Sequence, residues 1–227
     1  MKQSSFINAF FAILIRDIKL IFRRASEIAN PVIFFLIIVA IFPFGIGSEA
    51  NVMSKISSGV LWISVLLATI LAQDSLFRAD YEDGTLEQIC LCQYPLPVLV
   101  FAKIFVHWCA TGLPLLAISP IIAVLLNLNL DTYKALVCSL ALGTPSLSLI
   151  GAIGIALTIR VNRGGLLLAS LILPLYTPVL IFGANAVYAA SIGLPTAGYF
   201  YMLGSLALFA LVVSPIATSA AIRVSLN

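Results

Sequence analysis

The residues best suited to chemistry or to partner binding gather in one segment, positions 74–97. Its only basic residue is Arg78, and its other charges are all negative. This charge pattern is typical of a solvated acidic loop, and it also suits a docking surface for a soluble partner. The candidate partner-binding residues are Arg78, Asp80, Glu82, Asp83, Gly84, Thr85, Leu86, Glu87 and Gln88.

A short helix is predicted within this segment. Asp83-Gly84 marks a turn, and Thr85 followed three residues later by Gln88 is a capping-box pattern for a helix that ends before Pro95. A short helix presented on a cytoplasmic loop fits a groove on a soluble protein. We therefore expect this loop to be the coupling element if the chain has a soluble partner.

His107, the only histidine of the chain, is predicted about one turn inside a membrane-spanning helix, beside Trp108. An ionisable side chain within a span is a functional candidate, as a haem ligand, a proton carrier or an interhelical hydrogen-bond donor. Hydrogen bonding is the favoured interpretation, because no second ligand accompanies the histidine. Cys90 and Cys92 lie two residues apart, which on a helix directs their thiols to different faces and makes a poor chelate. The sequence predicts no metal site, and we expect the cysteines to be structural.

Several function classes are disfavoured by what the sequence lacks. No G-x-x-x-x-G-K-[ST] phosphate-binding loop occurs, so ATP hydrolysis of the P-loop kind would have to come from a partner. No polar dyad or triad lies within the predicted spans, which argues against an enzyme. The acids fall in loops, interfacial segments or span ends, whereas ion-driven transporters usually place carboxylates within their spans. A net charge of +3 gives no reason to expect nucleic-acid binding.

The composition identifies the elements that position these residues as membrane helices. Of the 227 residues, 62% are apolar and 9% are charged, whereas soluble domains carry roughly 25% charged residues. A membrane-spanning helix needs about 20 predominantly apolar residues. The sequence therefore predicts an all-α, polytopic membrane protein, a single permease domain over residues 1–227 with six spans within 31–222. The spans are predicted at about 31–44, 56–73, 101–126, 135–159, 165–187 and 199–222.

Residues 6–28 are predicted to form an amphipathic interfacial helix before the first span. Apolar side chains share one face of this helix, and basic residues that include Arg16 and Lys19 lie on the opposite face, near lipid phosphates. If the N-terminus is cytoplasmic, Lys55 and Lys134 are the only two of the 12 lysines and arginines on the outer side. The positive-inside rule therefore predicts that both termini are cytoplasmic.

Prolines and small residues within the predicted spans suggest how the helices pack and bend. Pro114, Pro145 and Pro174 each remove a backbone hydrogen bond and tend to kink a helix, so we group them with His107 and Trp108 as candidate intramembrane functional residues. A stripe of small residues in the fourth span permits close helix approach, within the chain or across a dimer. The stripe consists of Ser148, Ala152 and Ala156.

Taken together, motifs along nearly the whole chain resemble the heme exporter protein B family, the membrane subunits of the haem-exporter ABC transporter of cytochrome c maturation. No single motif is decisive, and their shared order and spacing are specific. The motifs are ASEIANP at 25–31, LFR at 76–78, DGTLEQ at 83–88, HW at 107–108, TGLPLL at 111–116, LGTP at 142–145, RGG at 163–165 and LPL at 173–175.

The resemblance implies a non-catalytic permease of the type-2 ABC exporter fold in the bacterial inner membrane. It implies that ATP hydrolysis by a partner is coupled to haem transfer or to release of a haem-loaded chaperone in cytochrome c-type biogenesis. The implied partners are a cytoplasmic P-loop ATPase docked through the 74–97 loop, a tryptophan-rich haem-handling membrane protein, a small single-span subunit and a periplasmic haem chaperone. A second copy of the chain, as a homodimer, is a further candidate partner that the small-residue stripe allows. In that family the haem ligands belong mainly to the partners, so haem is expected as a transported substrate rather than a bound cofactor, and ATP is bound only through the partner. A secondary transporter, or a permease for another small molecule, is the alternative.

Overall fold

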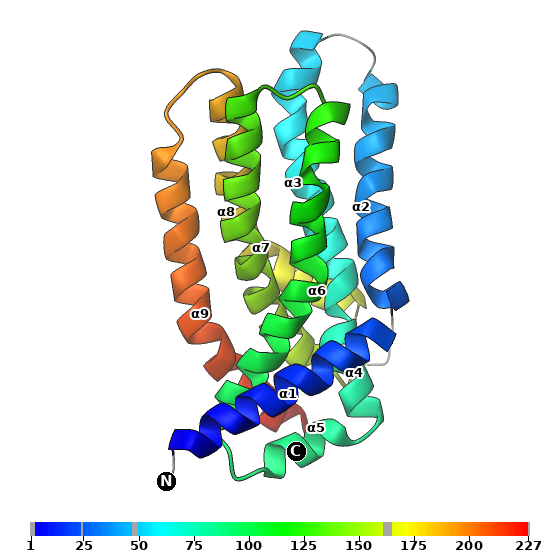
Figure 1. Cartoon of the computed structure of the whole chain (residues 1–227), viewed down its shortest axis with the longest axis vertical. Coiled ribbons are helices and arrows are strands. Elements are labelled where there is room, and N and C mark those ends of the chain that lie inside the picture. Colours follow the sequence, from blue (N-terminus) through cyan, green and yellow to red (C-terminus); the bar gives the residue numbers. More distant parts are fainter. Residues whose placement is uncertain (1–2, 24, 47–49, 161–164, 227) are drawn as a thin grey trace.

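The computed structural model describes residues 3–23, 25–46, 50–160 and 165–226, with side chains for 10–20, 29–42, 56–160 and 170–226. All regular secondary structure in these residues is helical: α1 (Gln3–Arg23), α2 (Ala25–Ile46), α3 (Ala50–Gln73), α4 (Ser75–Glu82), α5 (Thr85–Leu91), α6 (Leu96–Leu125), α7 (Leu130–Thr158), α8 (Gly165–Ser191) and α9 (Ala197–Leu226). The helices α2, α3, α6, α7, α8 and α9 form a bundle along the long axis (Figure 1). The helix α1 crosses the bundle at one end, where α4 and α5 also lie; this is the α4–α5 end, and the opposite one is the far end.

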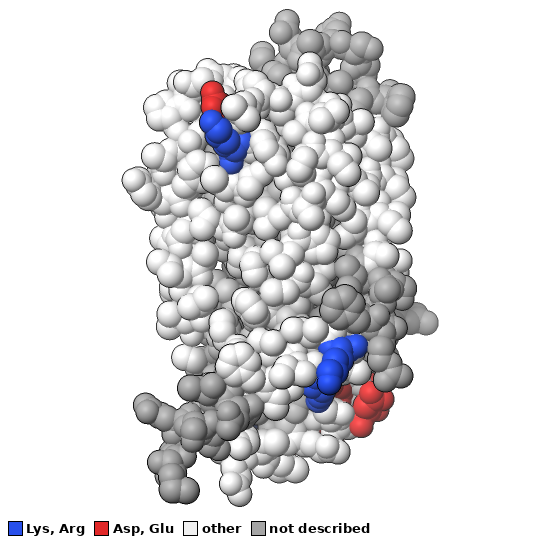
Figure 2. Space-filling model, in the orientation of Figure 1, with Lys and Arg blue, Asp and Glu red and all other residues white. Residues whose placement is uncertain are grey.

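The bundle has the length and the surface of a membrane protein. Five stretches of the described residues are long and apolar enough to cross a membrane: Ile56–Glu82, Leu96–Leu125, Leu130–Thr158, Ser170–Ser191 and Ala197–Leu226. The predicted first span falls on α2, whose described apolar part, Ala29–Phe42, is shorter. Figure 2 shows the charged side chains of one face at its two ends, with a broad uncharged band between them. The chain is therefore a multi-pass membrane protein.

The predicted spans match the observed helices except where the chain enters the bundle. The predicted amphipathic helix is too long, because α1 ends at Arg23 and residues 25–28 belong to α2. The first span, predicted from about 31, begins too late, since Pro31 lies in the second turn of α2. A proline there removes one backbone hydrogen bond, which membrane helices tolerate. Pro97, assigned to the loop by the sequence, lies in the first turn of α6, where its missing N–H would have no helical partner.

The helix α7 occupies the centre of the bundle, in contact with α3, α6, α8 and α9. Side chains of later helices donate hydrogen bonds to its carbonyls: Tyr176 of α8 to Leu147 at 2.8 Å, and Ser225 of α9 to Ala156 at 2.8 Å. The predicted small-residue stripe of α7 is buried in these contacts, so it packs helices within the chain. Its members are Ser148, Ala152 and Ala156.

Trp62 of α3 fills the space between α7 and α8, and two glycines make room for it. A Cβ atom placed on Gly143 of α7 would lie 2.3 Å from Trp62 Cη2. One placed on Gly183 of α8 would lie 2.2 Å from Trp62 Cε2. Both distances are far inside van der Waals contact, so the fully buried indole ring excludes any larger side chain at either position. The ring thereby sets the spacing of three helices.

Candidate functional site

The acidic segment forms two short helices packed on the bundle. Their apolar side chains, Phe77 of α4 and Leu86 of α5 among them, are buried. On the outer side of α4, Arg78 forms ion pairs with Asp74 at 2.9 Å and with Glu82 at 3.8 Å. Isolated helices of 8 and 7 residues are unstable in water. Burial of one face against the bundle therefore maintains the helical structure of this charged segment.

A turn at Asp83-Gly84 joins α4 to α5, as the sequence predicts. Gly84 has φ of 71°, in the left-handed region that favours glycine. The predicted capping box is wrong, because Thr85 is the first helical residue and no described side chain caps α5. The N-cap residue is Gly84, whose carbonyl accepts the first helical hydrogen bond from the backbone N–H of Gln88 at 3.5 Å. Glycine reaches this conformation without strain and is tolerated at an N-cap.

The candidate partner-binding residues divide into an outward group and an inward group. Glu82, Asp83 and Glu87 are exposed, and Leu91 at the end of α5 is 86% exposed. Asp80 is turned toward the bundle, with a side chain only 12% exposed. The remaining candidates are exposed at Arg78 and Gln88, half-buried at Gly84 and Thr85, and buried at Leu86.

Asp80 belongs to a set of four charged residues that joins α1, α4 and α6, and that we name the charge cluster: Arg16, Asp17, Asp80 and Lys103. Lys103 Nζ lies 3.0 Å from Asp17 Oδ2 and also contacts Asp80 Oδ2. Arg16 contacts the same two acids, with Nε 2.9 Å from Asp17 Oδ1 and Nη2 2.9 Å from Asp80 Oδ1. Each cation therefore touches both carboxylates. The side chains of Lys103 and Asp17 are only 6% and 9% exposed, and that of Arg16 is 34% exposed.

The charges of the cluster balance one another. Partial burial by itself lowers the pKa of Arg16, but the carboxylates of Asp17 and Asp80 outweigh this effect and raise the pKa above its ordinary value. The sequence interpretation missed the cluster, because it gave Asp17 and Lys103 no role in a site. The available signal was a lysine within the apolar run of α6, since a cation there needs a counter-ion.

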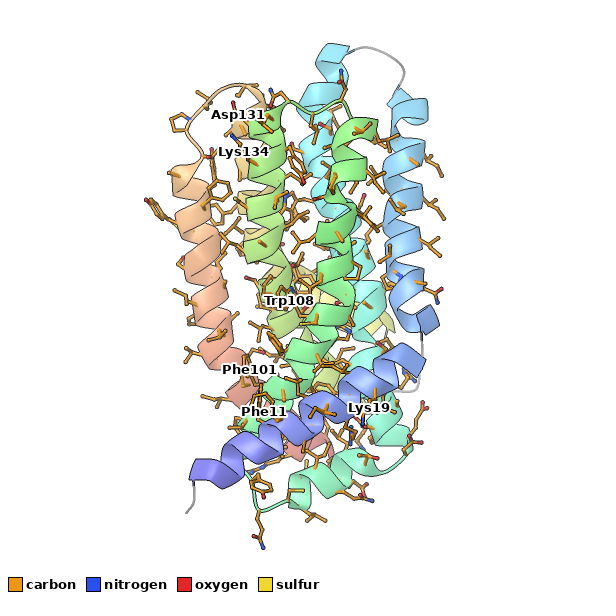
Figure 3. The ribbon with its side chains drawn as sticks, in the orientation of Figure 1. Phe11, Lys19, Phe101, Trp108, Asp131 and Lys134 are labelled. Atoms are coloured by element: carbon orange, nitrogen blue, oxygen red, sulfur yellow. The ribbon has the colours of Figure 1, made fainter. Side chains whose placement is uncertain are left out.

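The helix α1 lies against α6 with apolar side chains directed outward. Phe11 and Ile15 are exposed, and the ring of Phe10 stacks on Phe101 of α6 with 6.3 Å between the ring centroids. The prediction that Arg16 lies near lipid phosphates is wrong, because its guanidinium pairs with the carboxylates of Asp17 and Asp80. Lys19 remains exposed on α1, near the α4–α5 end (Figure 3).

His107 and Trp108 connect α6 to two different helices. His107 Nε2 lies 3.0 Å from the Ala72 carbonyl at the end of α3, and the residue is only 7% exposed. A carbonyl can only accept, so Nε2 carries the proton in this contact. The indole N–H of Trp108 donates to Thr144 Oγ1 of α7 at 3.0 Å. Both side chains therefore form interhelical hydrogen bonds.

A pocket of about 110 Å³ lies beside the charge cluster, lined in part by Asp83, Lys103 and His107. In the part of the chain that the structure describes, no group of three His, Cys, Asp or Glu residues is placed to hold a metal ion. Cysteines 90, 92, 109 and 138 are free thiols. The candidate prolines lie inside the long helices rather than at the cluster: Pro114 in α6, Pro145 in α7 and Pro174 in α8.

Comparisons with known proteins cover both the α4–α5 segment and the charge cluster. The family model described as CcmB protein matches residues 8–225. Heme exporter protein B of Pseudomonas aeruginosa is 47% identical over 220 residues, which are 97% of this chain and 99% of that protein. Heme exporter protein B of Haemophilus influenzae is 44% identical over 218 residues, 96% of this chain and 99% of that protein. Heme exporter protein B of Escherichia coli K12 is 45% identical over 218 residues, with the same coverage of 96% and 99%.

Proposed function

The chain belongs to the CcmB protein family, which makes it a membrane component of haem export, and we propose that it couples ATP hydrolysis by a partner subunit to haem delivery for cytochrome c assembly. The observation that carries the coupling role is the α4–α5 segment, which presents exposed acids outside the bundle. An external source of ATP chemistry is required in this proposal because the chain has no P-loop motif.

In this proposal the chain crosses the bacterial inner membrane six times in the type-2 ABC exporter arrangement, with α2 as the sixth span and the α4–α5 end in the cytoplasm. The sixth crossing is supported by the position of α2, which runs beside α3 within the bundle (Figure 1). Among the lysines and arginines whose side chains are described, Lys134 alone lies at the far end. The positive-inside rule then favours a cytoplasmic α4–α5 end with both termini inside.

The ATPase subunit docks on the outward face of α4 and α5. Glu82, Asp83 and Glu87 give this face negative charge, and Leu91 adds an apolar side chain that is 86% exposed. The complementary surface is a groove with a basic rim and an apolar floor. Only Asp74 separates α3 from α4, so a displacement of the docked α4 acts directly on the end of a bundle helix.

Haem is the transported substrate in this proposal, and partner proteins ligate it. His107 is 7% exposed and hydrogen-bonded to α3, which supports a structural role rather than haem ligation. The result of coupling is haem transfer or release of a haem-loaded chaperone. The proposed partners, besides the ATPase, are a tryptophan-rich haem-handling membrane protein, a small single-span subunit, a periplasmic haem chaperone and a second copy of the chain.

The proposal is tested by reversing the charge of the docking face. The double variant Asp83→Lys with Glu87→Lys is expressed with the ATPase and haem-handling partners, and the complex is purified from membranes through a tag on this chain. We expect the amount of co-purified ATPase to fall roughly tenfold, which corresponds to about 1.4 kcal/mol of binding, and c-type cytochromes to fall with it. Like charges would then face each other across the contact.

The matched control is Asp131→Lys, which reverses an acid whose side chain is 83% exposed at the far end. We expect this variant to retain both the ATPase and the c-type cytochromes. Wild-type levels of ATPase and cytochromes in the double variant would show that this face is not the docking site. A wild-type complex without any P-loop ATPase would refute the coupling role itself.

A further inference from the structure

The charge cluster connects three helices that are distant in the sequence. Lys103 of α6 contacts Asp17 of α1, 86 positions away, and Arg16 of α1 contacts Asp80 of α4, 64 positions away. Lys103 also contacts Asp80, and Arg16 also contacts Asp17. Since each cation bridges both carboxylates, α1, α4 and α6 cannot slide past one another without breaking an ion pair.

Stability alone is a weak reason for such an arrangement. Taking charges out of water costs so much free energy that buried ion pairs can often be replaced by apolar side chains without loss. What ion pairs supply in addition is a fixed register, because charge-assisted hydrogen bonds require a narrow range of distance and direction. The helix α4 has few other attachments, since its buried side chains are Leu76 and Phe77. The cluster thus supplies the ion pairs that attach α4 to α1 and α6.

The helix α6 contacts both helices that meet at the α3–α4 junction: the end of α3 and, beyond the junction, α4. His107 contacts the carbonyl of Ala72 in the last turn of α3, and Lys103, one helical turn away, contacts Asp80 in α4. The pocket of about 110 Å³ lined by both Lys103 and His107 leaves room beside these contacts. A movement of α4 relative to α3 can therefore be accommodated here and must act on α6.

We propose that the charge cluster transmits the displacement of α4 to α6 and α1, so that Arg16, Asp17 and Lys103 are positioning residues for coupling. This inference rests on the proposed function, in which a docked ATPase moves α4. The helix α6 carries the displacement into the bundle, and α1 moves with it as one unit.

The test uses Lys103→Met in the full-length chain, expressed with its ATPase and haem-handling partners. Methionine retains most of the apolar stem of lysine and removes the charge, whereas Lys103→Arg retains the charge. Lys134→Met is the matched control, because Lys134 pairs with Asp131 at 3.6 Å on the exposed surface of the far end. For each variant the co-purified ATPase, the ATP hydrolysed per complex and the c-type cytochrome formed per complex are measured.

We expect Lys103→Met to retain ATPase binding and ATP hydrolysis, and to lower the cytochrome formed per ATP hydrolysed by roughly fivefold or more. Lys103→Arg and Lys134→Met should keep the wild-type ratio. A second variant, Lys103→Met with Asp80→Asn, removes one charge of each sign and leaves Arg16 beside Asp17. It avoids an uncompensated buried charge and should show the same loss of coupling.

The inference is overturned if both variants form as much cytochrome per ATP hydrolysed as the wild type. This holds even if the variants reduce the number of complexes in the membrane. That result would assign the cluster a purely structural role. Absence of a P-loop ATPase from the wild-type complex is a different result, because it refutes the proposed function and the inference with it.

Discussion

Replacing Gly183 by alanine should weaken the bundle, although alanine favours helices. The added Cβ would lie 2.2 Å from Trp62 Cε2, roughly 1.5 Å short of ordinary carbon contact. The indole ring has no free side to move toward, because Gly143 lies in close contact with it as well. Overpacking of this kind costs about 1–3 kcal/mol, and the helix propensity of alanine contributes about 1 kcal/mol in the opposite direction. The expected net loss is therefore up to about 2 kcal/mol.

The loss can be measured as a shift of the temperature at which the detergent-purified protein stops eluting as a single monodisperse species. For a chain of this size, a loss of up to about 2 kcal/mol corresponds to a midpoint up to roughly 8 °C lower. Gly204→Ala in α9 is the matched control, because nothing lies within 4 Å of a Cβ placed on Gly204. Its midpoint should be unchanged or higher. Equal midpoints for the two alanine variants would refute the packing argument.

A double variant tests the same contact from the other side. Trp62→Phe removes part of the indole ring, so Gly183→Ala should cost much less in that background than in the wild type. This coupling between the two substitutions is the sign of direct contact. An equal cost in both backgrounds would mean that Gly183 is constrained by something other than Trp62.

Two further predictions concern side chains elsewhere in the fold. Trp108→Phe removes the hydrogen bond to Thr144, so it should cost about 1 kcal/mol and lower the same thermal midpoint by roughly 2–4 °C. If Trp108→Phe lowers the midpoint just as much in a Thr144→Val background, the loss of this hydrogen bond is not the cause. Burial raises the pKa of the Cys90 thiol above its ordinary value of 9.0, so near pH 7.5 little of it is thiolate. In single-cysteine variants a maleimide should therefore label Cys90 more slowly than the exposed Cys92. The labelling rate of Cys90 should keep rising as the pH passes 9.0. Equal labelling rates for the two cysteines at pH 7.5 would contradict this prediction.

The positions of the long helices could be predicted because the preference of a side chain for lipid is a local property. The apolar run expected at 165–187, for example, corresponds to α8, Gly165–Ser191. The same reasoning placed the turn at Asp83-Gly84, since glycine favours the positive φ that Gly84 adopts there. It assigned the wrong cap to α5, because a hydroxyl in a capping pattern and a glycine just before it are both plausible helix starts, and the local sequence does not decide between them.

The charge cluster could not be predicted, because it depends on which side of each helix meets the bundle. Asp80 and Asp83 lie three positions apart in the same acidic segment, yet Asp80 is nearly buried and pairs with Lys103, whereas Asp83 is exposed. The pairing of Asp17 with Lys103 joins residues 86 positions apart. Likewise, nothing in the sequence around Trp62 indicates that Gly143 and Gly183 lie against its ring. Such contacts follow from how the helices assemble, and no local pattern encodes them.

The charge cluster also constrains the order in which the helices can come together as the chain is synthesised. Arg16 leaves the ribosome 64 residues before Asp80, and Asp17 leaves it 86 residues before Lys103. Until α6 has emerged, Asp17 has no counter-ion in another helix, and burying its carboxylate against the bundle would be costly. We therefore expect the nascent α1 to dock on the bundle only after α6 has emerged. The complete cluster can form only once Asp80 of α4 and Lys103 of α6 have both been synthesised.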